Sequence, residues 1–479
     1  MITRPNASGR RDLDATVQDN RLVALINEHD IETVSIVGTD FHGIARGKHV
    51  PASRVLANTQ TIVNISSYML MMDCQGMPHP SPTSTDVWWP SWEEGYTDLR
   101  MVADASTARV VPWQKSNVIV QCDYEHSEQR WPLEFMPRAL VHKLSERLQS
   151  LGYTPMFTNE LEWLLFRETE QSAYDKGYRD LNPLSPTAQC YNLTRSGRDA
   201  DLVRPFIDNL VAFGVPIEVW SAEFGPGMQE FNIAPEPALA AADTAFVFKH
   251  AVREIAAQHD LFPVFMAKPS MAGFGNGLHV NHSLWQNGEP AFYDTAMPDK
   301  RSILLKQCVA GELATLKDFT LLFCPTPNSY RRFVAHYSTG HKIGWGHDNK
   351  SIAIRTVIES PNTCRIEHRT AGADANPYIA IAACLAGMVH GIENKLEPPP
   401  PVVGDGFLNE SLDVVPQTMR EACDLFEASE LAREYLGEDF VRFYAQTRRI
   451  ELEMFDEAVG DASPEEVSDW ELMQYADNV

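Results

Sequence analysis

Two glutamates in one short segment have a spacing that suggests chemistry. In residues 156–166 (MFTNELEWLLF), the two-residue period of a strand places Glu160 and Glu162 on one face and Leu161 and Trp163 on the other. An amphipathic strand with one solvated face explains this pattern. The apolar flanks favour a second interpretation, a buried strand on which two neighbouring carboxylates are unfavourable unless a cation binds both.

Two more glutamates flank a tight bend. Glu223 and Glu230 lie on either side of the Gly-Pro-Gly sequence at 225–227. A hairpin or bulge at this bend would direct both carboxylates to one point. An ordinary turn with surface acids is the alternative.

A glycine-rich segment, residues 273–285 (GFGNGLHVNHSLW), comes next. Its three glycines precede His279, so the backbone there can approach a ligand closely. Strand alternation then places His279, Asn281 and Ser283 on one face. A single histidine is more often structural than a ligand, and a glycine-rich loop alone is a weak signal for phosphate binding.

Alternating charges mark the fourth segment. Arg365, Glu367 and Arg369 share one strand face, which describes either a solvated row of ion pairs or a phosphate clamp with a metal-binding acid at its centre. Upstream, residues 328–332 (NSYRR) and 349–355 (NKSIAIR) add further cationic side chains.

Strands and helices must position these segments. We expect a hairpin of strands 33–37 and 45–50 around a turn at 40–43, and the helical segments are expected at 17–29, 137–151, 236–258, 375–394 and within 418–454. The polar run 123–130 is the predicted domain boundary. We therefore predict a flexible arm at 1–16, a small domain at 17–128 and a large domain at 129–479.

Length and composition restrict the class of protein. The chain has 479 residues, which suggests two domains, and its formal net charge of −25 argues against nucleic acid or an anionic membrane as the main partner. Its eight cysteines are dispersed without a CxxC pair, and the N-terminal residues lack an apolar signal segment. The apolar stretches are too short to span a bilayer. We expect a cytoplasmic protein.

Taken in order, the segments resemble the glutamine synthetase family over nearly the whole chain. The matching motifs are the ExE strand, the E…QE turn, GNGxHxxxS, NSYxR, the IR strand, RxExR and DANPY at 374–378. DFHGIARGK at 40–48 resembles the small domain of the longer amide-forming members. The resemblance implies an α+β fold with a small β-grasp-like N-terminal domain and a large catalytic domain, an antiparallel sheet backed by helices. It also implies a homo-oligomer of stacked rings, usually a dodecamer, with active sites between subunits.

The same resemblance implies a set of metal ligands. One metal ion would be held by Glu162, Glu223 and Glu230, and a second by Glu160, His279 and Glu367. Sites rich in carboxylates with one imidazole suit Mg²⁺ or Mn²⁺, and two or three such ions are expected.

Substrate roles also follow from the resemblance. Arg332 and Arg369 would hold glutamate and the transferring phosphoryl group, with Glu367 beside them as the third catalytic residue. Gly275 and Glu162 would also contact glutamate. ATP would be bound by Ser283, Asn281, Lys350, Arg355 and Arg365. ATP would activate the γ-carboxylate as an acyl phosphate, which the amine then attacks.

The departures from the family pattern concern the amine. Members that use ammonia carry an aspartate and a flap glutamate where this chain has Asn64 and Ser338. Lys350, Asn281 and Met228 replace a family arginine, histidine and glutamine. Without the two acids, we predict that free ammonia is a poor substrate.

Two classes of amine fit this prediction. A basic amine such as a polyamine or ethanolamine would need replacement acids, which Asp73, Glu93 or Glu94 could supply. A weakly basic apolar or aromatic amine would need none, and the apolar pocket for it would be lined by Trp88, Trp89, Trp92 and Tyr96, although such residues are more often core or interface. Three rival functions stay open: an ammonia-using glutamine synthetase, a phosphotransferase that ligates no amine, and a non-catalytic member of the fold, which would be expected to have lost ligands that are all present here.

Overall fold

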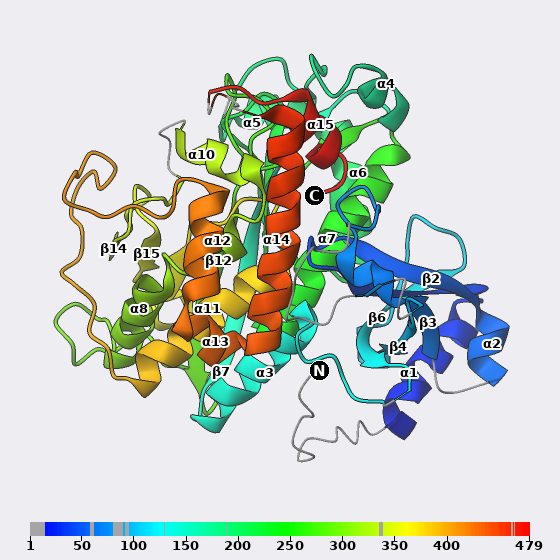
Figure 1. Cartoon of the computed structure of the whole chain (residues 1–479), viewed down its shortest axis with the longest axis horizontal. Helices are drawn as coiled ribbons and strands as arrows, with labels where there is room; N and C mark the ends of the chain where they lie inside the picture. Colours follow the sequence, from blue (N-terminus) through cyan, green and yellow to red (C-terminus); the bar gives the residue numbers. More distant parts are fainter. Residues whose placement is uncertain are drawn as a thin grey trace.

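The computed structural model of the chain describes residues 15–57, 62–79, 90–91, 95–128, 130–188, 190–334, 339–460, 463 and 465–479. It combines two sheets with many helices, so the predicted α+β class is confirmed (Figure 1). The small sheet lies on one side of the molecule, next to α7 (Ala238–Ala257) and α14 (Glu438–Val459).

The small sheet comes from the first part of the chain. Its strand order is β2 (Ala45–Pro51), β1 (Thr33–Thr39), β6 (Asn117–His126), β4 (Asp98–Ala103) and β3 (Ile62–Ser66), with β5 (Arg109–Val110) beside β6. The first helices are α1 (Ala15–Glu28) and α2 (Ala52–Ala57). Helix α1 begins inside the predicted arm 1–16, and residues 1–14 of that arm lie outside the described ranges.

The predicted hairpin of β1 and β2 is confirmed. Thr33 to Thr39 pair antiparallel with Pro51 to Ala45. At the turn, the buried Asp40 carboxylate accepts hydrogen bonds from the backbone N–H groups of His42 and Ile44, both at 2.9 Å. Its other oxygen binds Arg46 at 2.9 Å. These bonds fix the turn that carries His42.

The large sheet lies in the second part of the chain. Its order is β14 (Trp345–His347), β15 (Ile354–Val357), β16 (Arg365–His368), β12 (Leu278–Gln286), β7 (Thr154–Phe166), β9 (Met228–Ile233) and β8 (Ile217–Ala222). The short strands β10 (Glu236–Pro237) and β11 (Phe262–Val264) pair with β7, and β13 (Glu289–Pro290) pairs with β12. Every pairing is antiparallel except that of β14 with β15.

Helices cover this sheet. α3 (Pro137–Ser150), α7, α8 (Ile303–Thr315) and α11 (Pro377–Glu393) pack on one another, and α11 is buried almost all round, as its apolar sequence indicates. The predicted helices at 137–151, 236–258 and 375–394 are confirmed within two residues. The shorter helices are α4 (Glu170–Asp175), α5 (Leu193–Arg198), α6 (Ala200–Ala212), α9 (Thr320–Phe323) and α10 (Arg331–Val334).

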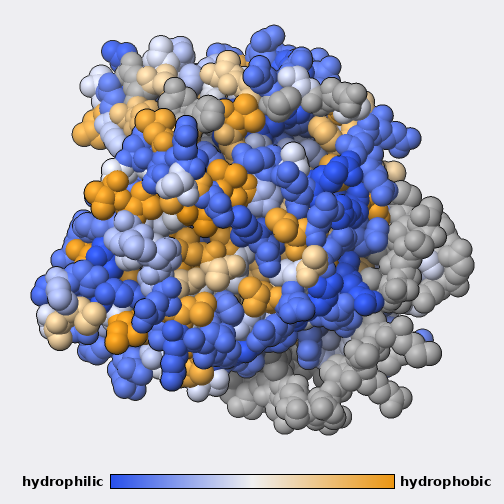
Figure 2. Space-filling model, turned by 60° about the vertical axis from the view of Figure 1, so that its left-hand side comes forward, coloured by the Kyte–Doolittle hydropathy of each residue, from blue (hydrophilic) through white to orange (hydrophobic). Residues whose placement is uncertain are grey.

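The C-terminal segment forms α12 (Met419–Ala428), α13 (Glu430–Leu436), α14 and α15 (Asp469–Tyr475). This agrees with the helices expected within 418–454. No helix in the described ranges has the length and apolar character needed to cross a bilayer. On the side that carries β14, β15 and α8, hydrophobic residues gather in patches among hydrophilic ones (Figure 2).

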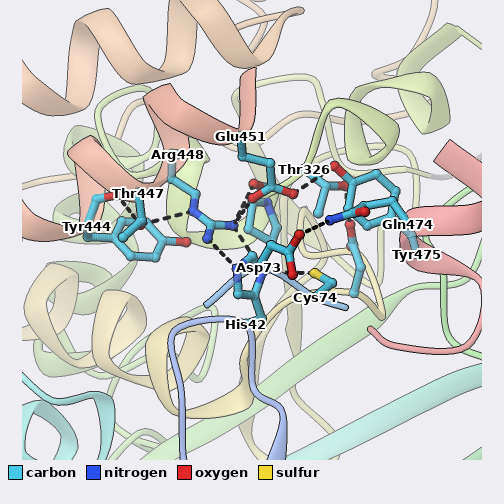
Figure 3. A network of polar contacts seen from close by, with 12 residues as sticks. His42, Asp73, Cys74, Thr326, Tyr444, Thr447, Arg448, Glu451, Gln474 and Tyr475 are labelled. Carbon is cyan, nitrogen blue, oxygen red and sulfur yellow. Dashed lines mark hydrogen bonds and ion pairs between the residues drawn. The ribbon is translucent and has the colours of Figure 1, made fainter. Parts of the chain in front are cut away.

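Polar contacts join the small sheet to the rest of the chain, and two groups of charged side chains are among them. At the first, Arg138 on α3 forms ion pairs with Asp104, Asp123 and Asp243 at 2.8 to 3.0 Å. The second, which we call the junction cluster, consists of His42, Cys74, Arg448 and Glu451 (Figure 3). The predicted domain boundary at 128/129 falls between β6 and α3 and stays a prediction.

Candidate active site

The order of the strands in the large sheet determines which residues of the predicted site lie next to one another. Arg355 on β15 pairs in register with Glu367 on β16, and His279 on β12 pairs with Glu160 on β7. Further along, Glu162 on β7 pairs with Glu230 on β9. In the hairpin of β8 and β9, the backbone N–H of Glu223 donates to the carbonyl of Met228, the first residue of β9. This hydrogen bond spans the bend at 225–227 and holds Glu223 next to the strand that carries Glu230. Acids far apart in sequence therefore become neighbours in space.

These residues line one cavity of about 1010 Å³. Its wall includes eleven residues predicted from the sequence, which are Glu160, Glu162, Glu223, Glu230, Gly275, His279, Arg332, Lys350, Arg355, Glu367 and Arg369. Within β7, Leu161, Trp163 and Leu165 are fully buried while Glu160 and Glu162 are half-buried. β7 is therefore a buried strand with two neighbouring carboxylates, as in the second of the two interpretations of its sequence.

The carboxylates near the β8–β9 hairpin repel one another. Burial and the neighbouring glutamates, first among them Glu160 and Glu162, raise the pKa of Glu230 to about 8. Burial and the Glu162 charge also raise the pKa of Glu223. Negative charge here is therefore not balanced by the protein.

Glu367 shows the opposite balance. It is fully buried, which raises a carboxyl pKa, but Arg369, His279 and Arg355 outweigh burial and lower the pKa of Glu367 to about 2. Both arginines form ion pairs with its carboxylate. Glu367 is thus ionised and holds Arg355 and Arg369 at the cationic end of the cavity.

The donor set fits divalent metal ions. Donor atoms of Glu160, His279 and Glu367 lie within 4.8 Å of one another, so one ion could contact all three. Glu162, Glu223 and Glu230 supply a second group of carboxylates. A cation bound there would stabilise the ionised forms of Glu223 and Glu230, whose pKa values are raised. Oxygen ligands with one imidazole suit Mg²⁺ or Mn²⁺.

The glycine-rich loop lies against Arg332. A Cβ atom at Gly275 would come within 2.7 Å of the Ala267 carbonyl and 2.9 Å of Arg332 Cγ, so only glycine fits. Arg332 donates from Nη1 to the Thr370 carbonyl at 3.0 Å, and the backbone N–H of Gly277 donates to Glu162. The loop thus positions an arginine and a carboxylate together.

Several predicted residues do not line the cavity. Asn281 donates to Glu160 at 3.0 Å and accepts from Arg365 at 2.9 Å, so these two form a layer behind the acids. Ser283 Oγ accepts from the Trp285 indole at 3.2 Å. Their predicted contacts with ATP stay predictions.

The residues predicted for the amine are mostly elsewhere or outside the described ranges. Asn64 is exposed on β3, opposite Arg100, and is not part of the cavity wall. Asp73 is buried, accepts from the Met77 backbone at 2.8 Å, contacts Gln474 and is not part of this cavity wall, and its role as a replacement acid stays a prediction. Tyr96 packs against Tyr68 instead. Ser338, Trp88, Trp89, Trp92, Glu93 and Glu94 lie outside the described residues.

Sequence reasoning missed other parts of the wall. Lys268 lines the cavity and donates to the Gly273 carbonyl, and burial with the nearby Arg332 charge lowers its pKa to about 8. Tyr191, Phe224, Met271 and Phe274 form an apolar part of the wall. Cys190 contacts Glu223 at 3.4 Å. Two features of the sequence could have indicated this apolar wall. Phe224 is adjacent to Glu223, and Phe274 lies within the glycine-rich segment.

Comparisons with known proteins agree with this geometry. Residues 134–475 match the model of the glutamine synthetase catalytic domain. The chain belongs to the glutamine synthetase family. It is 32% identical to a glutamate–isopropylamine ligase of a Pseudomonas species over 94% of this chain and 96% of that one. It is 34% identical to the gamma-glutamylethanolamide synthetase GlnA4 of Streptomyces coelicolor over 94% of both chains.

The solved structures support the fold. A GmaS complex with ADP superimposes with a TM-score of 0.78 at 24% identity and covers 94% of this chain and 98% of that chain. Ligases of the family use ATP and divalent metal ions, so the prediction of an enzyme of the ligase class is confirmed. The resemblance to the glutamate–amine branch is confirmed as well, although glutamine synthetases of other organisms also match at 28 to 32% identity.

Proposed function

We propose that the protein joins the γ-carboxylate of L-glutamate to an amine other than ammonia, with ATP as the energy source and a γ-glutamyl phosphate as the intermediate. The observation that carries this proposal is the single cavity in which the five predicted glutamates and His279 meet Arg332, Arg355 and Arg369. A carboxylate is a poor electrophile, so it needs conversion to an acyl phosphate before an amine can attack.

The chain's own residues would position the first step. Arg332 and Arg369 bind the anionic oxygens of glutamate and of the phosphoryl group in transfer, and Lys350 with Arg355 faces the phosphates of ATP. Glu367 holds Arg355 and Arg369 in place through its two ion pairs. Divalent ions at the two donor sets would neutralise the charge that accumulates between phosphate and carboxylate.

The nature of the amine is supported by the residues at two positions. Asn64 and Ser338 stand where ammonia-using members carry acids, which removes a site for ammonium and a base. Relatives named for isopropylamine and ethanolamine support an organic amine without selecting one. Ammonia itself is the second candidate, because glutamine synthetases are among the relatives.

We also propose that the protein forms a homo-oligomer whose sites lie between subunits. Strand β8 is an edge of the large sheet, and it exposes 53% of Val219 and 44% of Trp220. An exposed apolar edge strand is unfavourable unless another chain covers it. Light scattering of purified protein tests this, and a monomer at micromolar concentration contradicts it.

The reaction is tested by phosphate release from ATP in the presence of glutamate and one amine at a time. Ammonia, methylamine, isopropylamine, ethanolamine, putrescine and aniline form the panel, and mass spectrometry identifies each γ-glutamyl product. We expect at least one organic amine to exceed ammonia in kcat/KM. Preference for ammonia contradicts the amine assignment, and release of a phosphorylated product without added amine indicates a phosphotransferase.

A further inference from the structure

We infer that Phe224 and Phe274 form the wall of an amine subsite that contacts the carbon substituent of the amine, and that the protein therefore favours amines with an apolar substituent. This inference rests on the proposed function. It assigns a site to side chains that the metal and phosphate chemistry leaves unused.

The two ends of the cavity differ in charge. Lys350, Ser351 and Arg355 come from the β14–β15 side, where a polyphosphate finds cations. Across the sheet, Glu160 and Glu162 lie on β7, Glu230 lies on β9, and Glu223 follows β8. Without bound cations, this acidic end would repel a nucleoside triphosphate, and a nucleophile that attacks the activated carboxyl group must approach from somewhere other than the phosphate side. The β8 end of the cavity is thus the end that we assign to the amine.

An aromatic pair stands at that acidic end. Phe224 and Phe274 stack with ring centroids 5.4 Å apart and an angle of 27° between planes. Phe224 directly follows Glu223, and its backbone N–H donates to the Glu223 carboxylate at 3.2 Å. The apolar wall therefore begins one residue from the acid cluster.

The exposure of this pair leaves an aromatic surface that an apolar group can cover. Phe224 is 55% exposed although it lines a cavity, while Phe274 is partly buried against the core cluster beneath it. Water in contact with an aromatic face is released when an apolar group covers it, which favours binding by roughly four-fold for each methylene buried. A purely polar ligand gains nothing from this surface.

A different aromatic side chain serves the opposite end. Phe407 lines the cavity together with Lys350, Ser351 and Asp405, the side assigned to the nucleotide. An adenine ring at that end would lie near Phe407, which packs against His341 with ring centroids 5.1 Å apart. The Phe224–Phe274 pair is left for the substituent of the amine.

The test compares amines of increasing length with one enzyme. For methylamine, n-propylamine and n-butylamine, we expect kcat/KM of the wild-type protein to rise about four-fold per methylene that reaches the pair. In Phe224→Ser, the ratio of kcat/KM for n-butylamine to that for methylamine should fall about ten-fold. Phe224→Leu, which keeps an apolar surface, should retain most of the ratio, and Val403→Ala, 93% exposed outside this wall, should keep all of it.

Two further measurements separate the explanations. The KM for ATP should stay within two-fold in Phe224→Ser, and a large rise would show that the pair contacts adenine, which overturns the inference. Preference for putrescine over n-butylamine would show that the wall receives a second ammonium group through cation–π attraction, which also overturns it.

Calorimetry distinguishes failure of the inference from failure of the proposed function. Binding of n-butylamine to the wild-type holoenzyme with ADP, Mg²⁺ and glutamate requires no turnover. Binding that Phe224→Ser weakens about ten-fold, with no γ-glutamyl product from any amine, would refute the proposed reaction and keep the subsite. Binding that is absent or equal in both proteins refutes the subsite even if the reaction proceeds.

Discussion

The acid cluster in the cavity and the junction cluster at His42 use the same types of residue but balance their charges differently. In the cavity, burial and mutual repulsion leave Glu223 and Glu230 with raised pKa values, so the protein supplies too little positive charge for them. At the junction, burial also raises the pKa of Glu451, but this carboxylate lies 2.7 Å from Arg448, whose charge lowers that pKa. The acid cluster in the cavity therefore needs a bound cation, whereas the junction cluster already contains the guanidinium of Arg448.

Distance between donor atoms does not separate the two sites. Donor atoms of His42, Cys74 and Glu451 lie within 4.8 Å of one another, as do those of Glu160, His279 and Glu367. At the junction, however, Arg448 donates to His42 Nε2 at 2.8 Å, and burial together with the Arg448 charge lowers the pKa of His42 far below its usual value (Figure 3). A metal ion there would have to displace a fixed guanidinium. Because the charges that act on Glu223 and Glu230 come from other glutamates, we expect a metal ion in the cavity and not at the junction.

The two clusters also differ in what they connect. His42 and Cys74 come from the small-sheet part of the chain, and Arg448 and Glu451 come from α14. The Tyr475 hydroxyl on α15 adds a 2.7 Å hydrogen bond to Glu451. The junction therefore holds parts of the fold together, whereas the acid cluster opens onto a cavity.

The largest effect should come from breaking the junction. Arg448→Met leaves Glu451 buried without its partner, and we expect a loss of about 3–5 kcal/mol in the free energy of unfolding. Urea denaturation followed by circular dichroism measures this loss. Arg442→Met on the same helix is the matched control, because its ion pair with Glu438 is about half exposed and should be worth less than about 1 kcal/mol. Equal losses in the two variants would contradict the structural role of Arg448.

A substitution in the acid cluster should lower activity strongly and change the free energy of unfolding little, in contrast to a substitution at the junction. Glu230→Gln replaces a carboxyl whose pKa is already about 8, so the unfolding free energy without metal should change by less than about 1 kcal/mol. Metal ions stabilise transition-state charge by several kcal/mol, so activity should fall on the order of 100-fold or more. Steady-state kinetics and urea denaturation of one preparation give both values. Glu218→Gln, an exposed acid on the same hairpin, should change neither.

Metal binding sharpens the comparison further. Mn²⁺ at 100 times its Kd should raise the unfolding free energy of the wild-type protein by about 2.7 kcal/mol, and EDTA should remove both this gain and the activity. Cys74→Ser at the junction should leave the gain intact, while Glu230→Gln should reduce it. Thermal denaturation with and without metal measures the gain, and its disappearance in Cys74→Ser would place the ion at the junction.

The sequence predicted the carboxylate-rich part of the cavity better than its apolar wall. Strand period and ordered motifs were enough for Glu160, Glu162, His279 and Glu367, because short strands fix which face each side chain takes. The wall formed by Phe224 and Phe274 was missed, because stacking between a hairpin and a loop depends on tertiary packing that no local pattern encodes. Asp73 was proposed as a replacement acid from its residue type alone. The fold buries it near α15, and that role stays a prediction.

The layer behind the acids had a similar limit. The resemblance directed Asn281, Ser283 and Arg365 toward ATP, but strand β12 places Asn281 between Arg365 and Glu160. Alternation predicts the face of these residues but not how far they reach, which depends on the neighbours that fill the space in front of them, and their contacts with ATP stay predictions.

The smallest effect should come from this layer. Asn281→Ala removes the 3.0 Å hydrogen bond that Asn281 donates to Glu160, together with the hydrogen bond that it accepts from Arg365. Groups that orient a metal ligand typically contribute about 10-fold or more to metal affinity, so we expect the Mn²⁺ concentration at half-maximal activity to rise about 10-fold with little change in kcat at saturating metal. A metal titration of activity measures this shift. If Asn281 instead binds ATP directly, the KM for ATP should rise while the metal dependence stays the same, because the nucleotide contact and the Glu160 contact act on different ligands.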